Sequence, residues 1–309
     1  MKVQDISEDL VKICLKKRTG NTHKNDFGHV LAVAGSYRYS GAGAICANAA
    51  MRAGSGLVTL AVPSDTVNVM RNLLSEVILL DKDRFEDDYA KLIATADSIA
   101  VGSGLSWSKA TLNTVDTILK NANCPVVLDA DALNVMSVAD TALGSCVKVA
   151  EKTDNIKNNS QVGIPVIKSG KLFENCKNKT VITPHNGEFA RLSGLTVQEI
   201  ENNKIEVAYE FAKKNKTTVV LKGSRTVVTD GELIFKNDMN LPQMSTGGMG
   251  DALTGIIASF IGQNIDTLHS AVCGVYVHAI TAKKSGNMNS ILASDIISRL
   301  PYEIYALTH

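Results

Sequence analysis

The chain has 309 residues, 45% of them hydrophobic, and a formal net charge of +1. This length fits one large or two small globular domains, and the near-neutral charge excludes a broad electrostatic attraction to nucleic acid or to an anionic membrane. The first 18 residues carry charges throughout, unlike a signal peptide, and no apolar run reaches membrane-spanning length. We therefore expect a cytoplasmic protein that binds neither nucleic acid nor membrane.

Short β-branched segments alternate with helical patterns along the chain. The expected strands span residues 29–34, 57–62, 98–101, 125–129, 180–183 and 218–222, followed by a hairpin of 226–229 and 232–235. The expected helices span residues 42–53, 109–121, 197–214, 252–261 and 267–284. This alternation predicts an α/β fold with a mostly parallel central sheet and helices on both faces.

We interpret residues 1–309 as a single domain with two peripheral segments. Residues 1–22 have a modest amphipathic pattern and are expected to form an N-terminal helical extension, either a docking helix or an oligomer contact. Residues 140–179 are polar and weakly periodic, which indicates a surface excursion rather than a linker between domains.

A glycine-rich segment, Ser245–Asp251, directly precedes the apolar run 252–261. Glycines allow several backbone N–H groups to point at one anion, and the start of a helix adds a partial positive charge there. Asp251 would repel a bound phosphate, but it suits a base that takes a proton from a hydroxyl attacking that phosphate. From this segment alone, a plain glycine-rich turn with an acidic helix start is an equal alternative.

Glycine-rich or polar loops follow the other expected strands. Residues 35–44 and 102–105 are rich in glycine, His185 follows a proline, and residues 222–226 combine a lysine, a glycine and hydroxyls. Taken singly, each has an ordinary alternative in a tight turn, a structural histidine or a surface hairpin. Because ligands of such sheets bind beyond the carboxyl ends of the strands, the loops together predict one cleft for a phosphorylated ligand.

Two aspartates follow the expected strand 125–129. We interpret Asp131 as the cap of the next helix, because a short acidic side chain can accept the first free N–H groups of a helix. Asp129 stays open, since a carboxylate at a strand end could also hold metal-bound water or sugar hydroxyls.

These motifs together resemble the ADP/ATP-dependent NAD(P)H-hydrate dehydratase family of the ribokinase-like superfamily. The most discriminating one is Thr183-Pro184-His185-Asn186-Gly187-Glu188, which ribokinase relatives lack. The other matching segments are 23–28, 34–36, 41–42, 52–58, 102–105, 128–133, 221–223 and 247–251. The resemblance implies a ribokinase-like three-layer fold from about residue 23 to the end.

The resemblance also implies an activity. Such enzymes are lyases of metabolite repair, which convert hydrated NADH or NADPH back to NAD(P)H by phosphorylating the ring hydroxyl and eliminating phosphate. Asp251 would be the catalytic base. One alternative is a small-molecule alcohol kinase of the same fold, of the thiazole or hydroxymethylpyrimidine type. Another is a nucleotide-binding regulator that has lost catalysis.

Site residues carried over from the resemblance fall into three groups. The substrate-binding positions are Ala42, Gly104, His185 and Asp251. The nucleotide-binding positions are Lys222, Gly223, Ser224, Arg225, Thr226 and Gly250. The anion hole is formed by the backbone of Gly248, Met249 and Gly250. Mg²⁺ is expected to bridge the donor phosphates with few direct protein ligands, and Glu188 is a candidate for a contact through water.

The chain departs from the family pattern at Met249, where threonine or serine is usual, and at Asn25, where glycine is usual. ADP is favoured as the phosphate donor because the free-standing domain looks like the bacterial type, and ATP stays open. The chain has no room for the fused epimerase domain of many relatives, so the expected functional partner is a separate NAD(P)H-hydrate epimerase. A homo-oligomer is expected from the resemblance.

Overall fold

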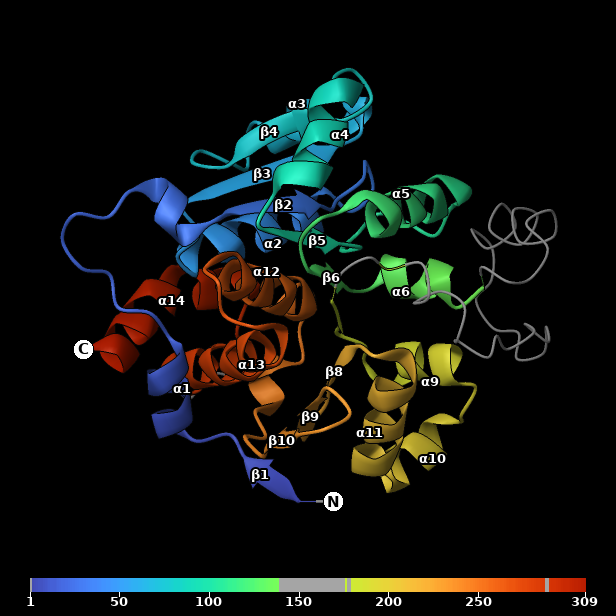
Figure 1. The fold of residues 1–309 in the computed structure, drawn as a ribbon, viewed down its shortest axis with the longest axis vertical. Coiled ribbons are helices and arrows are strands. Elements are labelled where there is room, and N and C mark those ends of the chain that lie inside the picture. Colours follow the sequence, from blue (N-terminus) through green and yellow to red (C-terminus); the bar gives the residue numbers. More distant parts are fainter. Residues whose placement is uncertain (1, 139–175, 177–178, 287–288) are drawn as a thin grey trace.

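The computed structural model describes residues 2–138, 176, 179–286 and 289–309 (Figure 1). Within these residues, ten strands form one central sheet. The strands are β1 (Val3–Asp5), β2 (His29–Val33), β3 (Leu57–Val62), β4 (Ile78–Asp81), β5 (Ser98–Val101), β6 (Val126–Leu128), β7 (Thr180–Ile182), β8 (Thr218–Leu221), β9 (Thr226–Thr229) and β10 (Ile234–Asn237).

The sheet order is β1-β10-β9-β8-β7-β6-β5-β2-β3-β4. Neighbouring strands are parallel except along β8, β9 and β10, which form an antiparallel meander. The expected turn between β9 and β10 is present, with Gly231 at φ +86° and the Asp230 carboxylate accepting hydrogen bonds from the N–H groups of Glu232 and Leu233. Strand β2 pairs with β3 on one side and with β5 on the other, so the order reverses between β2 and β5.

Helices cover both faces of the sheet (Figure 1). One face packs against α2 (Ser40–Arg52), α3 (Val67–Met70), α12 (Met249–Gly262), α13 (Thr267–Lys284) and α14 (Ala293–Thr308). The other face packs against α4 (Glu86–Thr95), α5 (Lys109–Asn121), α6 (Asp131–Met136), α9 (Asn186–Ser193), α10 (Val197–Asn202) and α11 (Lys204–Asn215). None of the helices described combines the length and apolar character needed to cross a bilayer.

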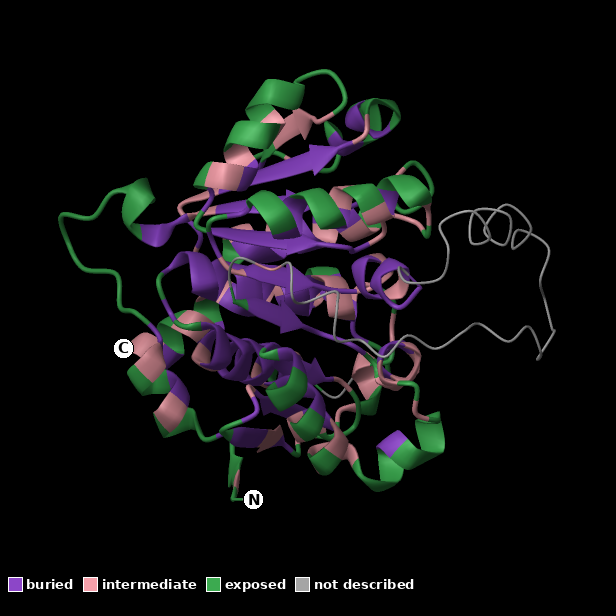
Figure 2. Cartoon of the chain, turned by 45° about the vertical axis from the view of Figure 1, so that its right-hand side comes forward, coloured by how far each residue is buried: buried purple, intermediate pink, exposed green. Residues whose placement is uncertain are grey.

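Alternation along the strands divides the apolar side chains between two cores. In β2, Val30 and Ala32 pack against α2 and α12, whereas Leu31 and Val33 face the opposite layer. Buried residues fill the sheet and the central helices, as the purple regions of Figure 2 show. A Cβ on Gly255 of α12 would lie 2.1 Å from the carbonyl oxygen of Cys46 in α2, so only glycine permits this close approach.

The expected mostly parallel α/β fold with helices on both faces is confirmed. Two details differ. The single helix expected over 197–214 is two helices, α10 and α11, which meet at Asn203. Edge strand β4 and helices α4 and α14 were not anticipated. Of the expected surface excursion at 140–179, all but residues 176 and 179 lie outside the described part of the chain.

The first 22 residues are only partly helical, which corrects the expected helical extension. Val3–Asp5 is a strand parallel to β10, and helix α1 spans Glu8–Cys14. Helix α1 packs on α13 of the same chain: Val11 is fully buried, and the Tyr276 hydroxyl donates to Glu8 Oε2 at 3.3 Å. Ile13 points away and is 82% exposed. The apolar face of α1 therefore docks onto its own domain.

Candidate active site

The loops after β2 and β5 meet where the strand order reverses. Gly35 N–H donates to the carbonyl oxygen of Ser103 at 2.7 Å. Gly104 has φ +65°, and a Cβ built on it would lie 2.7 Å from the Cβ of Ala42. Two predicted substrate positions, Ala42 and Gly104, are thus in contact at the switch point of the sheet, where open α/β folds bind their ligands.

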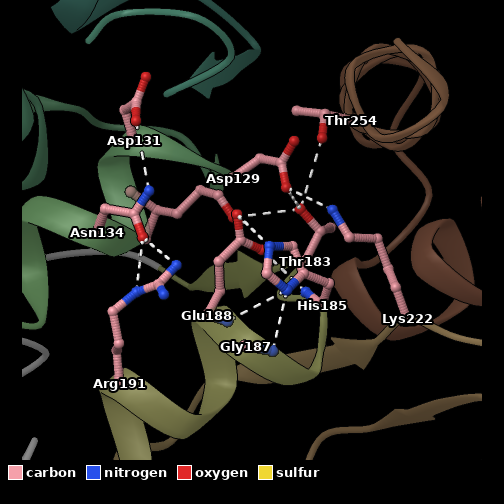
Figure 3. A network of polar contacts seen from close by, with 11 residues as sticks. Asp129, Asp131, Asn134, Thr183, His185, Gly187, Glu188, Arg191, Lys222 and Thr254 are labelled. Atoms are coloured by element: carbon pink, nitrogen blue, oxygen red, sulfur yellow. Dashed lines mark hydrogen bonds and ion pairs between the residues drawn. The ribbon is translucent and has the colours of Figure 1, made fainter. Parts of the chain in front are cut away.

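A buried charge pair lies at the ends of β6, β7 and β8 (Figure 3). Lys222 Nζ and Thr183 Oγ1 each donate to Asp129 Oδ1 at 2.8 Å. The three residues directly follow neighbouring strands, which brings them to the same edge of the sheet. Burial opposes ionisation of Asp129, which is 1% exposed, but the charge and hydrogen bond of Lys222 outweigh it and hold the pKa below its ordinary value.

Asp251 lies beside this pair in the first turn of α12. Burial raises its pKa to about 6, and the negative charge of Asp129 acts in the same direction. Ser103 Oγ makes no hydrogen bond within the described residues, yet it lies close enough to the Asp251 carboxyl to lower its pKa. A carboxyl with a pKa near 6 is mostly ionised at neutral pH and still basic enough to accept a proton.

The N-terminus of α12 faces the charge pair. Gly248 precedes the helix at φ +91°, and the first backbone N–H groups, of Met249, Gly250 and Asp251, have no acceptor within the helix. A Cβ on Gly250 would lie 3.0 Å from Lys222 Nζ and 3.7 Å from Asp129 Oδ2. This end of α12 therefore combines free donors, a partial positive charge and a nearby ammonium group, which suits a phosphate.

His185 caps α9 at the opposite wall of the site. Its Nδ1 accepts from Gly187 N at 2.9 Å and Glu188 N at 3.3 Å, while Glu188 Oε2 accepts from His185 N at 2.8 Å. Burial and the charges of Lys222 and Arg191 lower the pKa of His185, so its ring is neutral at pH 7. Because Nδ1 accepts, the proton is on Nε2, and the side chain is 57% exposed. The ring is thus both a structural cap and an exposed donor.

Glu188 is the acidic member of this cap. Its side chain is 6% exposed, its second oxygen lies 3.5 Å from His185 Nε2, and burial raises its pKa above the ordinary value. Within the described residues, no group of three or more histidine, cysteine or acidic side chains could hold a metal ion. A contact from Glu188 to magnesium through water stays a prediction.

A cavity of about 330 Å³ lies next to the charge pair and brings most of the predicted nucleotide positions together. Its lining includes Lys222, Gly223, Ser224, Thr226 and Gly250. Arg225 does not line it, because its side chain is 81% exposed and its Nε lies 3.8 Å from Asp238 Oδ1. The larger cavity of about 960 Å³, between α2 and α14, includes none of the predicted site residues.

Two features of the site were not predicted from the sequence. Lys204 of α11 donates from Nζ to the carbonyl oxygen of Lys222 at 2.9 Å, and burial lowers its pKa to about 8. No motif marked this lysine, which lies in a helix with several others.

Asp131 is not the helix cap: Ala130 occupies that position at φ +46°, and Asp131 Oδ2 accepts from Ser106 N at 2.8 Å. Asp131 therefore secures the loop after β5.

Comparison with known proteins identifies the family. The family model described as NAD(P)H-hydrate dehydratase matches residues 30–153 and 163–301. The chain belongs to this family. A bifunctional NAD(P)H-hydrate repair enzyme of Moorella thermoacetica is 32% identical, over 93% of the chain and 51% of that relative. An ADP-dependent (S)-NAD(P)H-hydrate dehydratase of Bacillus subtilis is 28% identical, over 97% of the chain and 98% of that relative.

The chain thus spans about half the length of the bifunctional relatives. Among solved structures, the ADP/ATP-dependent NAD(P)H-hydrate dehydratase of Bacillus subtilis, co-crystallised with ATP/Mg²⁺, matches with a TM-score of 0.78 at 26% identity and covers 99% of both chains. A ribokinase-like superfamily protein of Enterococcus faecalis matches with a TM-score of 0.77 at 23% identity, over 99% of this chain and 96% of that one. The expected family and the ribokinase-like fold are confirmed.

One departure from the dehydratase family pattern has a structural outcome. Met249, which stands where threonine or serine is usual, is 7% exposed and lines the 330 Å³ cavity. Its side chain therefore packs, and only its backbone N–H is left for an anion. The loss of a hydroxyl leaves the donors at the start of α12 in place.

Proposed function

We propose that this chain dehydrates hydrated NADH and NADPH at the expense of ADP or ATP, as a repair enzyme. The proposal rests mainly on the position and the pKa of Asp251. This residue lies between the free N–H groups of α12 and the loop of Ser103 and Gly104, and its pKa is about 6. A base, an anion site and the predicted substrate positions are therefore adjacent. Relatives named for this activity support the assignment.

In the first step, Asp251 takes the proton of the ring hydroxyl while that oxygen attacks the terminal phosphoryl group of the donor. The bond from phosphorus to the nucleotide breaks, and AMP leaves from ADP, or ADP from ATP. Backbone N–H groups of the predicted anion hole, Gly248 to Gly250, and the Lys222 ammonium stabilise the charge on the transferred group. Neutral His185 donates from Nε2 to a polar group of the substrate.

In the second step, the phosphate ester breaks down. The ring nitrogen supplies the electron pair that expels phosphate from the neighbouring carbon. Loss of a proton from the next carbon then restores the double bond of the reduced nicotinamide. The oxygen of the removed water leaves in the phosphate, so a kinase step with an unstable product has the net result of a dehydration.

Magnesium is proposed to enter with the donor, as the co-crystallised Bacillus subtilis relative suggests. When bound, the ion neutralises charge on the donor phosphates. This chain's own contribution is the Lys222 ammonium, the start of α12 and the loop 222–226, of which Gly223, Ser224 and Thr226 line the donor cavity. We propose ADP as the usual donor, since the full-length relatives are named ADP-dependent.

An epimerase is proposed as the functional partner. Full-length relatives are named for the (S)-hydrate, so the other epimer would have to be interconverted before a dehydratase of this type could repair it. Homo-oligomerisation and a cytoplasmic location stay predictions from the sequence.

The test is an absorbance assay at 340 nm with hydrated NADH, magnesium, and ADP or ATP in parallel. We expect absorbance to rise only when nucleotide is present, and the faster donor to be ADP. A stable phosphorylated product without recovery of NADH would instead support the alcohol kinase. Nucleotide binding without turnover of any substrate would support the inactive regulator.

A further inference from the structure

His278 of α13 is a buried histidine in the wall of the 330 Å³ cavity. His278 is 7% exposed, and its Nε2 has no hydrogen-bond partner in the described part of the chain. No motif of the sequence marked this residue. A buried polar atom left unpaired costs about 1–3 kcal/mol, so its presence in a cavity wall calls for an explanation.

The cavity lining combines polar and apolar groups. Lys222 and Gly250 lie at the part that adjoins Asp129, where positive charge and free N–H groups suit phosphates. Apolar side chains make up much of the remaining wall, namely Met239, Leu241, Met244, Leu253, Val275 and Ala279. Methionine and aliphatic side chains pack well against the flat face of an aromatic ring. These side chains suit a nucleobase.

His278 contributes a neutral polar group to this lining. Burial and the nearby Lys222 charge lower its pKa to about 4, so the ring is neutral at physiological pH. A neutral imidazole offers one N–H and one lone pair rather than a charge, which suits the polar edge of a base better than a phosphate. The phosphates already have a cation in Lys222.

We propose that His278 strengthens binding of the donor nucleotide through a hydrogen bond between its Nε2 and the base. The inference rests on the proposed function, because it assigns the donor to this cavity. The ligand satisfies a buried atom that is unpaired in the free protein. Before binding, the unpaired Nε2 destabilises the folded protein, and the hydrogen bond to the base removes this cost, which strengthens binding.

The test compares the wild type with His278→Leu and His278→Gln by calorimetric titration with ADP and with inorganic pyrophosphate. Leucine keeps an apolar shape without the nitrogen, and glutamine keeps a hydrogen-bonding group. We expect His278→Leu to weaken ADP about tenfold, as loss of one hydrogen bond implies, and to leave pyrophosphate unchanged. His278→Gln should recover part of the loss. The Tm without ligand should stay equal or rise in His278→Leu, because an unpaired polar atom is removed.

His269→Leu is the matched control, since His269 lies on the same helix, pairs with Asp266 at 2.7 Å and does not line the cavity. It should bind ADP as the wild type does. Equal ADP affinity in wild type and His278→Leu would overturn the inference, and so would equal weakening of ADP and pyrophosphate. A third outcome separates the two proposals. If His278→Leu weakens ADP binding but the wild type does not convert hydrated NADH to NADH, the proposed function is refuted and the contact to the base still stands.

Discussion

Asp129 and Asp251 are two aspartates of one site whose pKa values are shifted in opposite directions. Asp129 is the more deeply buried, yet its pKa is held below the ordinary value, because Lys222 Nζ and Thr183 Oγ1 both donate to it. Among the described residues, no cation forms an ion pair with Asp251, and burial raises its pKa to about 6 although Ser103 and the Lys222 charge act to lower it. Burial alone therefore does not decide the charge state of these carboxyls; the presence of a paired cation does.

The difference assigns the two residues different roles. A carboxylate held ionised by a cation is a poor proton acceptor, whereas an unpaired carboxyl with a raised pKa can exchange a proton near neutral pH. Asp129 also acts on its neighbour, because its fixed charge helps to raise the pKa of Asp251. We infer that the charge pair positions Lys222 and tunes the base, and that Asp251 alone carries out the proton transfer.

The largest expected effect removes the base. Asp251→Asn should lower kcat by about 10²–10⁴-fold and leave the Kd of ADP within about threefold, since only proton transfer is lost. Steady-state assays at 340 nm and calorimetric titration measure the two quantities. The folded-state pKa exceeds the ordinary value of 3.8, so the stability lost by ionising this carboxyl accumulates from there to about pH 6 and stays lost above it. The amide should thus maintain or raise the Tm at pH 8, and near-normal kcat would contradict the assignment.

Removing the Asp129 carboxylate should lower the thermal stability of the fold. Asp129→Asn leaves the Lys222 ammonium largely buried without its counter-ion, which costs about 3–5 kcal/mol, or on the order of 10 °C in Tm. The double variant Asp129→Asn/Lys222→Met should recover most of this loss, because neither charge of the pair is left without the other. Thermal melts at pH 7.5 measure both. A Tm unchanged by Asp129→Asn would show that the pair does not hold the site together.

His185 gives a smaller effect on the substrate side. His185→Ala removes an exposed donor, and we expect the KM for the hydrated cofactor to rise about tenfold, with a smaller change in the KM for ADP. Because the ring also caps α9, His185→Asn is the matched variant: it retains a capping side chain and should keep the wild-type Tm. An effect mainly on ADP would place the residue at the donor side.

The smallest expected effect comes from Ser103. Its hydroxyl lowers the pKa of Asp251, so Ser103→Ala should raise that pKa and move the acid limb of the pH–activity profile to higher pH. The change in rate at pH 8 should be less than about threefold, because Asp251 is ionised there in both proteins. A limb that moves to lower pH would contradict the proposed proximity of the two groups.

Much of the site could be predicted because its loops follow parallel strands. Residues 35–44, 102–105 and 222–226 reach one edge whatever the details of packing, and glycines with positive φ mark the turns. The pairing of Asp129 with Lys222 could not be predicted, because the residues are 93 positions apart and meet only through the order β6, β7, β8.

The features that were missed share a physical cause. Asp131 fits the capping rule by residue type, but Ala130 takes the cap conformation, and no local sequence rule anticipates a positive φ at alanine. Lys204 and His278 are polar residues within helical patterns, and only tertiary packing shows that His278 is buried and Lys204 half-buried. Strand β4 lies at the sheet edge with half-exposed side chains, so its apolar signal is weak.

The central claim is that Asp251 is the base and that Asp129 raises its pKa. The most direct test is the pH dependence of kcat/KM for hydrated NADH at saturating ADP and magnesium, in the wild type and in Asp129→Asn. The account predicts that kcat/KM rises through about pH 6 in the wild type and that this rise moves to lower pH in the variant, because a like charge has gone while Lys222 stays. A wild-type profile that is flat from about pH 4.5 to pH 8, or a variant whose rise moves to higher pH, would contradict it.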